Sequence, residues 1–375
     1  MKITIATSTG FHLRNLAAEL LDAGHEVRFY SYLPKWKTRS YGLPDTVCTS
    51  YFWRFLPWSA LALARFGGTS SCLLNIRESL FARLDDAIEN DMEVADIFVG
   101  LSAIAVRSAQ KAKAMGQLVL IERGATHIHS QSSVAQSAGA IPCTTTYVQR
   151  ELASYDAADR IVVLSSHAKA TFVEHGHEVD TVEIVCPGTD LRLFHGPEEP
   201  RTSHVKALYV GAWSKRKGAD LFAGLLREIP DLTLSHIGVK VDVAFPKTER
   251  FAALGYMDHA SLAAAMREHH VFIFPSRDDG FGMVLCEALA CGMRVVATTS
   301  SGAPDIARLV DSNIMTIVQP DSLPSLVEGT LEQLSHANAD KGASAISNRE
   351  REKFGWTQYA ERYINMIDRI LATRR

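Results

Sequence analysis

The sequence lacks the patterns that mark a disulfide-bonded, zinc-binding or membrane-spanning chain. Its six cysteines are scattered over 375 residues without a CxxC pair, which predicts reduced thiols in a protein core. No run of about 18 apolar residues occurs, which argues against a spanning helix. The amino-terminal stretch MKITIATSTG has neither the long apolar region nor the cleavage site of a signal peptide. We therefore expect a cytoplasmic protein.

An excess of charge of one sign is also missing. The 39 Lys and Arg against 42 Asp and Glu leave a net charge of −3, so no general field attracts nucleic acid. Apolar residues make up 47% of the chain and charged residues 22%, which is typical of a globular protein. Because 375 residues exceed the size at which one core stops growing, we expect two domains.

One aromatic stretch, residues 51–66 (YFWRFLPWSALALARF), stands out from this ordinary composition. Its aromatic side chains and its arginines could lie in a membrane interface, at the inner face of the membrane, or line an apolar acceptor groove. An insert packed on the protein core explains the stretch equally well. Peripheral membrane contact through residues 51–66 is therefore one of the open alternatives.

Short apolar runs alternate with segments of helical spacing in both halves of the chain. The predicted strands are residues 2–7, 26–31, 96–100, 118–122, 160–164, 205–210, 232–237, 271–274, 295–298 and 314–318. The predicted helices include residues 11–23, 103–115 and 356–372, the first two of which are followed by a glycine. This alternation predicts an α/β protein with two doubly wound, Rossmann-like domains. We place them at residues 1–190 and 191–355, with residues 356–375 as a closing helix.

Candidate site residues follow several of these strands, where ligands bind in such sheets. Gly10, after the first strand, permits close approach of a ligand to the backbone, although a simple tight turn explains it equally well. A complete GxGxxG fingerprint is missing, so an NAD site is only weakly indicated. The segment VGAWSKRKG (210–218) ends a strand and places three cations, Lys215, Arg216 and Lys217, at a helix start. Cations and open backbone amides at that position predict a diphosphate site.

The segment SRDDGFGMVLCEALACG (276–292) contains an acid, Glu287, in an otherwise apolar helix. We expect this helix to be buried on all sides, where an unpartnered carboxylate is strongly unfavourable. An acid near a helix start gains only roughly 0.3–1 kcal/mol from the helix dipole. A ligand diol such as a ribose can donate to both carboxylate oxygens and is the preferred explanation. An internal salt bridge is the alternative.

These segments together resemble glycosyltransferase family 4, whose members have the GT-B fold. The resemblance is carried by VGAWSKRKG, by PSRDDGFGMVLCEALACGMRVVAT (275–298) and by SGAPDI (301–306). In the first half, residues 95–116 and ERGATHI (122–128) resemble a subgroup of the family, and PGTDLRLF (187–194) matches its interdomain connection. The resemblance covers almost the whole chain. It implies two domains facing a cleft, the first for the acceptor and the second for the nucleotide sugar, with the closing helix returning to the first.

The resemblance also implies a reaction and roles for individual residues. The reaction is a retaining transfer from a nucleoside diphosphate sugar, such as a UDP- or GDP-sugar, to a glycan, lipid-linked or small-molecule acceptor. In the paired-acid (EX7E-like) motif Glu287 holds the ribose and Asp279 contacts the donor sugar, while Arg216 and Lys217 neutralise the leaving diphosphate. The backbone amides of four consecutive residues meet the sugar and phosphate: Phe281, Gly282, Met283 and Val284.

The chain departs from the family pattern at two positions. Asp279 stands where glutamate is usual, and Ala212 stands where an arginine is common. Arg216 can supply the charge that Ala212 does not. These departures keep a nucleotide-sugar-binding protein without turnover open as an alternative. An epimerase or a phosphorylase on the same fold is another.

His127, in the ERGATH loop, is the leading catalytic candidate of the first half, where it could bond a sugar hydroxyl or orient the acceptor. His129 and His12 compete with it. Arg123 could bind phosphate, but a structural pair with Glu122 explains it equally well. We expect no metal site, because the Asp278–Asp279 pair has no His or Cys ligands beside it and the cations do the neutralising work of a divalent ion.

Overall fold

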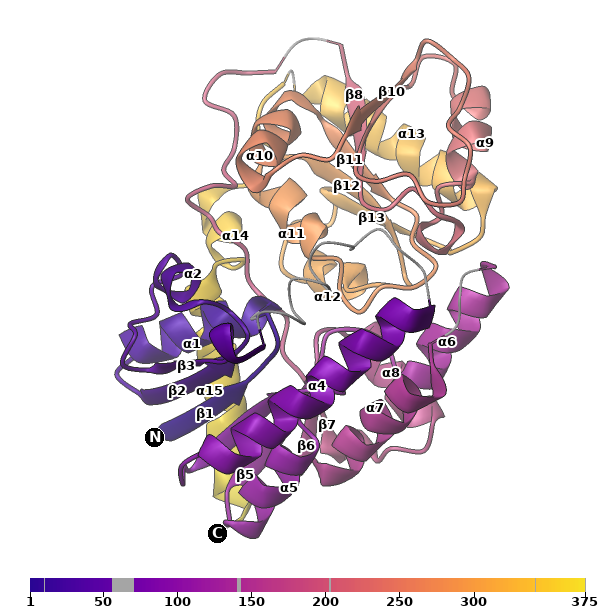
Figure 1. Cartoon of the computed structure of the whole chain (residues 1–375). Coiled ribbons are helices and arrows are strands. Elements are labelled where there is room, and N and C mark those ends of the chain that lie inside the picture. Colours follow the sequence, from indigo (N-terminus) through magenta and orange to yellow (C-terminus); the bar gives the residue numbers. More distant parts are fainter. Residues whose placement is uncertain (10, 56–70, 140–142, 202–203, 341, 375) are drawn as a thin grey trace. The chain divides into compact units, whose positions relative to one another are not determined.

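The computed structural model describes residues 1–9, 11–55, 71–139, 143–201, 204–340 and 342–374 (Figure 1). The chain forms two compact units. The first comprises Met1–Val163, Phe172–Val185 and Ala360–Arg375, and the second comprises Leu164–Thr171 and Cys186–Tyr359. The short segment Leu164–Thr171 is thus grouped with the second half of the chain, although it lies within the range 1–190 assigned to the first domain from the sequence.

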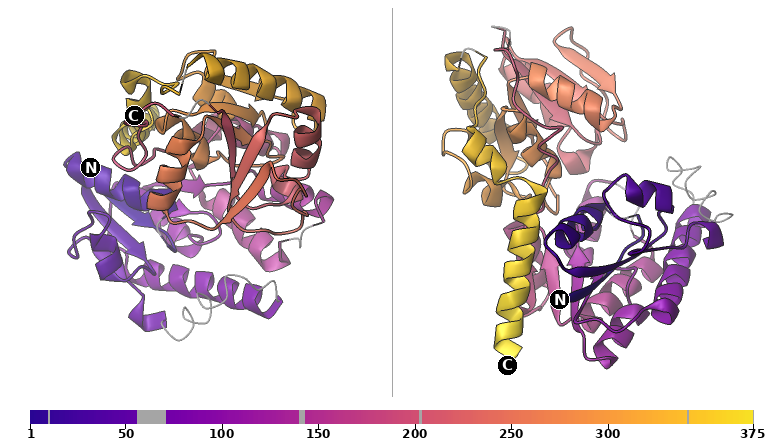
Figure 2. Two further views of the ribbon diagram at one scale, coloured as in Figure 1. Left: turned by 90° about the horizontal axis from the view of Figure 1, so that it is seen from above. Right: turned by 90° about the vertical axis from the view of Figure 1, so that its left-hand side faces the viewer.

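The first unit is built on a sheet of seven parallel strands in the order β3-β2-β1-β4-β5-β6-β7. The strands are β1 Lys2–Ala6, β2 Glu26–Ser31, β3 Cys48–Ser50, β4 Ile97–Leu101, β5 Leu118–Arg123, β6 Arg160–Val163 and β7 Val182–Ile184. The helices between them are α1 Phe11–Asp22, α2 Lys35–Arg39, η1 Trp53–Phe55, α4 Ser71–Asp91, α5 Arg107–Ala114, α6 Ile128–Ser137, α7 Thr145–Ala157, α8 Ser166–Glu174 and η2 Val179–Thr181. The part of α15 (Trp356–Arg374) from Ala360 onward also belongs to this unit, and Arg369 there bonds Glu183 at 2.6 Å (Figure 2).

Helix α5 begins at Arg107, four residues later than the sequence predicts. Ala103 has a φ of 60°, which is outside the helical region. The buried carboxylate of Asp85, on α4, accepts bonds from the amides of Val106, Arg107 and Ser108 at 2.9–3.1 Å. A side chain more than 20 positions away therefore caps the helix and fixes its start.

The second unit has a six-stranded parallel sheet in the order β10-β9-β8-β11-β12-β13. Its strands are β8 Lys206–Val210, β9 Thr233–Ile237, β10 Phe251–Gly255, β11 Val271–Phe274, β12 Arg294–Thr298 and β13 Met315–Val318. Its helices are η3 Lys215–Lys217, α9 Leu221–Glu228, α10 His259–Glu268, α11 Met283–Ala290, α12 Ala303–Ala307, α13 Leu323–Ala339 and α14 Asn348–Glu352. Helix α13 packs on β11, β12 and β13 (Figures 1 and 2).

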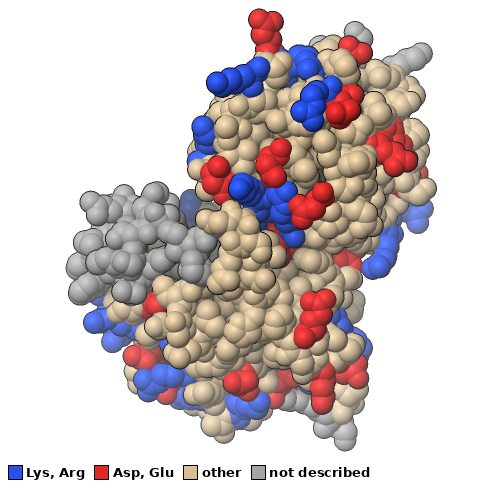
Figure 3. Space-filling view, turned by 90° about the vertical axis from the view of Figure 1, so that its right-hand side faces the viewer, with Lys and Arg blue, Asp and Glu red and all other residues tan. Residues whose placement is uncertain are grey.

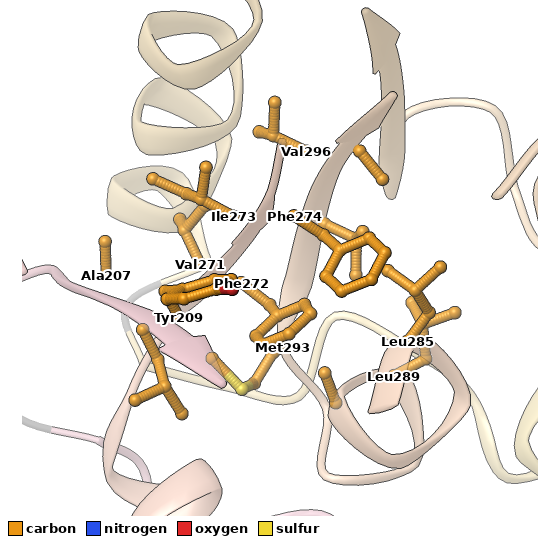
Figure 4. Packing of buried hydrophobic residues seen from close by; sticks show 14 of the residues in the cluster. Ala207, Tyr209, Val271, Phe272, Ile273, Phe274, Leu285, Leu289, Met293 and Val296 are labelled. Carbon is orange, nitrogen blue, oxygen red and sulfur yellow. The ribbon is translucent and has the colours of Figure 1, made fainter. Parts of the chain in front are cut away.

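The core of the second unit holds α11 firmly against the sheet. Every residue of β11 and β12 is buried, which explains why these strands are continuous apolar runs. Figure 4 shows Leu285 of α11 beside Phe274 of β11, and both side chains belong to the same buried cluster. Helix α11 therefore has a fixed position on the sheet, and so has the loop that precedes it.

All ten predicted strands are present, but the sequence did not reveal β3, β7 and β10. Among the described residues no helix is both long and apolar enough to span a bilayer. On the face shown in Figure 3, basic and acidic side chains are interspersed, without a wide area of one sign. This face agrees with the low net charge of the chain.

Candidate functional site

The second unit brings its polar loops together where the strand order reverses. Strands β8 and β11 are neighbours in the sheet although they are not consecutive in the chain. In doubly wound sheets such a switch point, at the carboxyl ends of the strands, is where ligands bind. The loop after β8 carries Arg216 and Lys217, and the loop after β11 carries Asp278 and Asp279. A backbone bond from the Arg277 amide to the Arg216 carbonyl, at 3.0 Å, joins the two loops.

The loop after β8 is held in place by buried groups at its base. Trp213 is fully buried, and His236 Nε2 lies 2.9 Å from the Gly211 carbonyl oxygen. Gly218 ends the short helix η3 with a φ of 74°, and a Cβ there would lie 2.0 Å from the Pro275 carbonyl oxygen. Only glycine fits such a close backbone approach. The two loops are therefore packed against each other, and η3 presents its cations at a fixed point.

Arg216 and Lys217 both reach the acidic loop. The guanidinium of Arg216 donates to the Asp278 carbonyl at 3.0 Å and lies 3.8 Å from the Asp278 carboxylate. The ammonium of Lys217 donates to the same carbonyl at 3.2 Å and forms an ion pair with Asp279. Burial lowers the pKa of Lys217, while Asp279 opposes that shift. Three of the predicted catalytic residues, Arg216, Lys217 and Asp279, thus form one cluster.

Glu287 lies on the open side of α11 rather than in a fully buried helix. Met283, Val284 and Glu287 are partly exposed, whereas the other residues from 283 to 291 are buried. Their i, i+1, i+4 spacing puts these three on one face of the helix. The prediction that this helix is buried on all sides is therefore wrong, because one stripe of it is only partly covered.

The carboxylate of Glu287 has no hydrogen-bond or ion-pair partner among the residues that the structure describes. It is nevertheless poorly hydrated, because desolvation by the surrounding groups raises its pKa from 4.5 to about 7. The alternative explanation, an internal salt bridge, is therefore not seen in the described part of the chain. Within the described chain Glu287 is thus a partly exposed, weakly solvated carboxylate aimed at no protein group.

The amino end of α11 supplies backbone donors next to this carboxylate. Gly282 is the N-cap with a φ of 82°, and the amides of Met283 and Val284 lie at the helix start, where an α-helix offers no carbonyl acceptor. The next amide, that of Leu285, donates to the Gly282 carbonyl at 2.8 Å. Met283 and Val284, both partly exposed, are the first two residues of that turn. The amide of Phe281 differs, since it donates to Asp279 Oδ1 at 3.1 Å. That amide is engaged by Asp279, so Gly282, Met283 and Val284 are the better ligand donors.

Sequence reasoning missed a segment that supports the acidic loop from the other half of the chain. Ser165, which is buried, donates its hydroxyl to the Gly280 carbonyl at 2.6 Å. His167 Nε2 lies 3.7 Å from the Asp278 carboxylate, and the Ser166 amide donates to Asp305 at 2.8 Å. No local pattern links residues 165–167 to a loop more than 100 positions away.

The first unit places His127 in a cluster of aromatic rings. His127 is the N-cap of α6, where its Nδ1 accepts a bond from the His129 amide at 3.3 Å. Its ring is 2% exposed, stacks on His175 with centroids 4.2 Å apart, and meets Phe172 edge-on. Burial, followed by the neighbouring His175, lowers its pKa to about 3. His127 is therefore a neutral imidazole, and its role in catalysis stays a prediction.

The other candidates of the first unit have structural partners. His12 Nε2 lies 3.1 Å from Glu122, and both side chains are fully buried. Arg123 forms an ion pair with Glu151 and donates to the Thr126 carbonyl at 3.2 Å. The suggested pair of Arg123 with Glu122 is wrong, because the two side chains are held by residues from other helices.

Two further predictions fall on residues outside the described part of the chain. Gly10 is one of them, and most of the stretch 51–66 is the other. Among the residues that the structure does describe, no group of three or more His, Cys, Asp or Glu side chains could hold a metal ion.

Comparison with known proteins supports this description of the second unit. Residues 204–336 match the family model for glycosyl transferases group 1. A phosphatidylinositol N-acetylglucosaminyltransferase subunit of Homo sapiens is 27% identical over 205 residues, which cover 51% of this chain and 42% of that protein. The D-inositol 3-phosphate glycosyltransferase of Paenarthrobacter aurescens is 26% identical over 256 residues, which cover 59% and 60%. The chain thus spans less than two thirds of the length of these curated relatives.

Among solved structures, Anabaena HepE in complex with UDP and glucose superposes with a TM-score of 0.64 at 14% identity, over 98% of this chain and 99% of that one. At this identity the likeness concerns the fold, and it extends over both units. With two Rossmann-like units on parallel sheets, the chain has the GT-B fold, and its second unit matches the group 1 glycosyltransferases.

Proposed function

We propose that the chain is a glycosyltransferase that uses a nucleoside diphosphate sugar as its donor. One observation carries the proposal: the Glu287 carboxylate is weakly solvated, has no partner among the described residues, and follows a helix amino end at the switch point of the sheet. A ribose diol donates two hydroxyl bonds to such a carboxylate. The family model that matches residues 204–336 and the UDP in the HepE structure support a nucleotide-sugar donor, such as a UDP- or GDP-sugar.

Arg216 and Lys217 take the diphosphate in this proposal. They now hold the Asp278 carbonyl and the Asp279 carboxylate, and a diphosphate offers stronger acceptors to both. As the sugar–phosphate bond breaks, negative charge grows on the leaving phosphate. Cations already fixed at that point stabilise it without reorganisation, which is the largest catalytic contribution that this site offers. In this account the charge of the leaving group is neutralised without a divalent ion.

Asp279 and the amides of Gly282, Met283 and Val284 orient the donor sugar. The Asp279 side chain is 23% exposed, so it can accept a bond from a sugar hydroxyl while it stays paired with Lys217. The resemblance to family 4 favours a retaining reaction, in which the acceptor attacks on the face of the departing phosphate. The acceptor is a glycan, a lipid-linked saccharide or a small molecule. His127 in the first unit is our candidate for contact with a sugar hydroxyl.

A calorimetric panel followed by a transfer assay tests the proposal. We expect one of UDP, GDP and ADP to bind, and the matching sugar donor to transfer its sugar in the presence of EDTA. The anomeric configuration of the product, read by NMR, should equal that of the donor. Binding of none of the three nucleotides would contradict the donor site. Binding with no transfer to any acceptor would point to a nucleotide-sugar-binding protein, and turnover without an acceptor to an epimerase.

A further inference from the structure

Two tryptophan side chains of the first unit are unusually exposed. Trp36, in α2, is 64% exposed and Trp53, in η1, is 75% exposed. A tryptophan loses much favourable burial when it faces water, so exposed tryptophans mark surfaces that contact something else. Basic residues flank both of them in the sequence, as Lys35-Trp36-Lys37 and Trp53-Arg54. We name these five residues the aromatic–basic surface.

The fold places both halves of this surface at one edge of the sheet. Strands β2 and β3 are parallel neighbours, and Ser31 at the end of β2 pairs with Ser50 at the end of β3. The chain therefore leaves both strands at the same edge, and neighbouring strands are only about 4.8 Å apart. Two further bonds tie the exits together: the Tyr51 amide donates to the Ser31 carbonyl at 2.9 Å, and the Ser50 hydroxyl donates to the Leu33 carbonyl at 2.7 Å.

Buried residues of η1 and α2 leave both tryptophans on the outer side. Phe55 is buried and meets the ring of Tyr32 edge-on at 5.6 Å. Because Phe55 ends η1 on its inner side, Trp53 and Arg54 are left on the outer side, where both are exposed. In α2, Thr38 is the buried residue, so Lys35 and Trp36 face outward. Helix α2 is visible beside α1 in Figure 1.

The charge of this region is opposite to that of the whole chain. Residues 32–55 contain four basic residues, at 35, 37, 39 and 54, and a single acid, Asp45, whereas the chain carries a net charge of −3. Asp45 is engaged by Arg39 at 2.7 and 2.8 Å. Lys35, Lys37 and Arg54 therefore carry the remaining positive charge. Lys37 lies 5.3 Å from the ring of Tyr41 and Arg54 lies 5.6 Å from the ring of Phe55.

We propose that the aromatic–basic surface docks the first unit on a bilayer that contains anionic lipid. Tryptophan prefers the boundary between lipid headgroups and acyl chains, and lysine or arginine beside it is attracted by anionic headgroups. Each tryptophan here has a cation next to it in the chain, as this dual attraction requires. All five residues of the aromatic–basic surface lie in the first unit, so docking does not depend on the proposed sugar transfer. If sugar transfer is also confirmed, it favours a lipid-linked acceptor.

Vesicle sedimentation tests the docking directly. We expect the protein to sediment with vesicles of phosphatidylcholine and phosphatidylserine, to remain in the supernatant with phosphatidylcholine alone, and to be released by salt. A Lys35→Glu/Lys37→Glu variant should bind roughly 30-fold more weakly or worse, since each lost cation is worth about 1 kcal/mol at such a surface. A Trp36→Ser/Trp53→Ser variant should bind more weakly and should lose the blue shift of tryptophan emission that vesicles cause.

A matched control carries the same change in charge on the second unit. Arg227 and Arg349 are exposed side chains of the second unit. The Arg227→Glu/Arg349→Glu variant has the same net charge as the Lys35→Glu/Lys37→Glu variant, and it should bind vesicles nearly as tightly as the wild-type chain. Equal loss of binding in the control, equal binding to neutral vesicles, or no sedimentation at all would overturn the proposal. Nucleotide affinity, measured by calorimetry on the same variants, should not change. A failure of docking is thereby separated from a failure of the donor site.

Discussion

The two units use ionisable side chains at the carboxyl edges of their sheets in different ways. In the first unit, His12 and Glu122 lie 3.1 Å apart with both side chains fully buried, and Arg123 pairs with Glu151. In the second unit, Glu287 is partly exposed, and no described residue bonds its carboxylate. Both sheets have the same topology at their switch points. These ionisable groups of the first unit are paired with one another, whereas in the second unit no described residue bonds the Glu287 carboxylate.

This difference separates structural from ligand-binding charges. A buried charge with a charged partner has a structural role. Removing either partner leaves the other one buried and unpaired, which destabilises the fold. A desolvated charge without a partner costs stability, and such residues are kept at sites where a ligand supplies what the protein does not. Glu287, with a pKa raised to about 7, has the features of the second kind, and its role in ligand binding is our proposal.

The largest expected effect is on the stability of the first unit. A Glu151→Ala variant leaves the buried guanidinium of Arg123 without its carboxylate, which should lower the free energy of unfolding by about 3–5 kcal/mol. Urea unfolding measures this change. An Arg123→Met/Glu151→Leu variant, which removes both charges, should recover most of the loss. A cost below about 1 kcal/mol for Glu151→Ala would show that the pair is not a structural one.

The next effect is on catalysis in the second unit. A Lys217→Ala variant should lower kcat for sugar transfer by about 10²–10³-fold, because one preorganised cation at the leaving phosphate is lost. The neighbouring Lys215 is exposed, so Lys215→Ala is the matched control and should keep most of the activity. Equal activity of both variants would remove Lys217 from the catalytic machinery.

A smaller effect concerns stability and pH. The pKa of Glu287 is raised on folding, so the folded state favours the protonated form and loses stability as pH rises from 4.5 through about 7. A Glu287→Gln variant should therefore be more stable than the wild-type chain by about 1–2 kcal/mol at pH 8, and nearly unchanged at pH 4.5. Chemical unfolding at the two pH values measures this difference. Glu328→Gln, on the exposed side of α13, is the matched control for the loss of one carboxylate.

The sequence reveals the interior of each sheet better than its edges. Buried strands such as β11 and β12 are continuous apolar runs, so their pattern is unambiguous. Strand β3 has only three residues, Cys48–Ser50, too few to show a strand pattern. Strand β10 is apolar but mostly exposed, and its alanines and glycine are residues that are depleted in strands. The start of α5 depends on Asp85, a partner that is distant in the chain.

For the site residues, the sequence reveals features that are local in the chain but not contacts between distant segments. Glu287, Arg216 and Lys217 can be proposed as site residues from the sequence because each stands out against its own local pattern. The partners of Arg123 and the contact of His167 with Asp278 were not found, since they join segments that are far apart in the chain. The open stripe on α11 was also missed, because an apolar side chain can be partly exposed without any change in the sequence pattern.

The most direct test of the ribose role of Glu287 compares a nucleoside diphosphate with its 2′,3′-dideoxy analogue by calorimetry. The nucleotide is the one that binds tightest among UDP, GDP and ADP. Loss of the diol should weaken binding to the wild-type chain by about 1.5–3 kcal/mol, while Glu287→Gln should bind both compounds with similar, low affinity. Equal affinity of the wild-type chain for the two compounds, or undiminished discrimination by Glu287→Gln, would contradict the account.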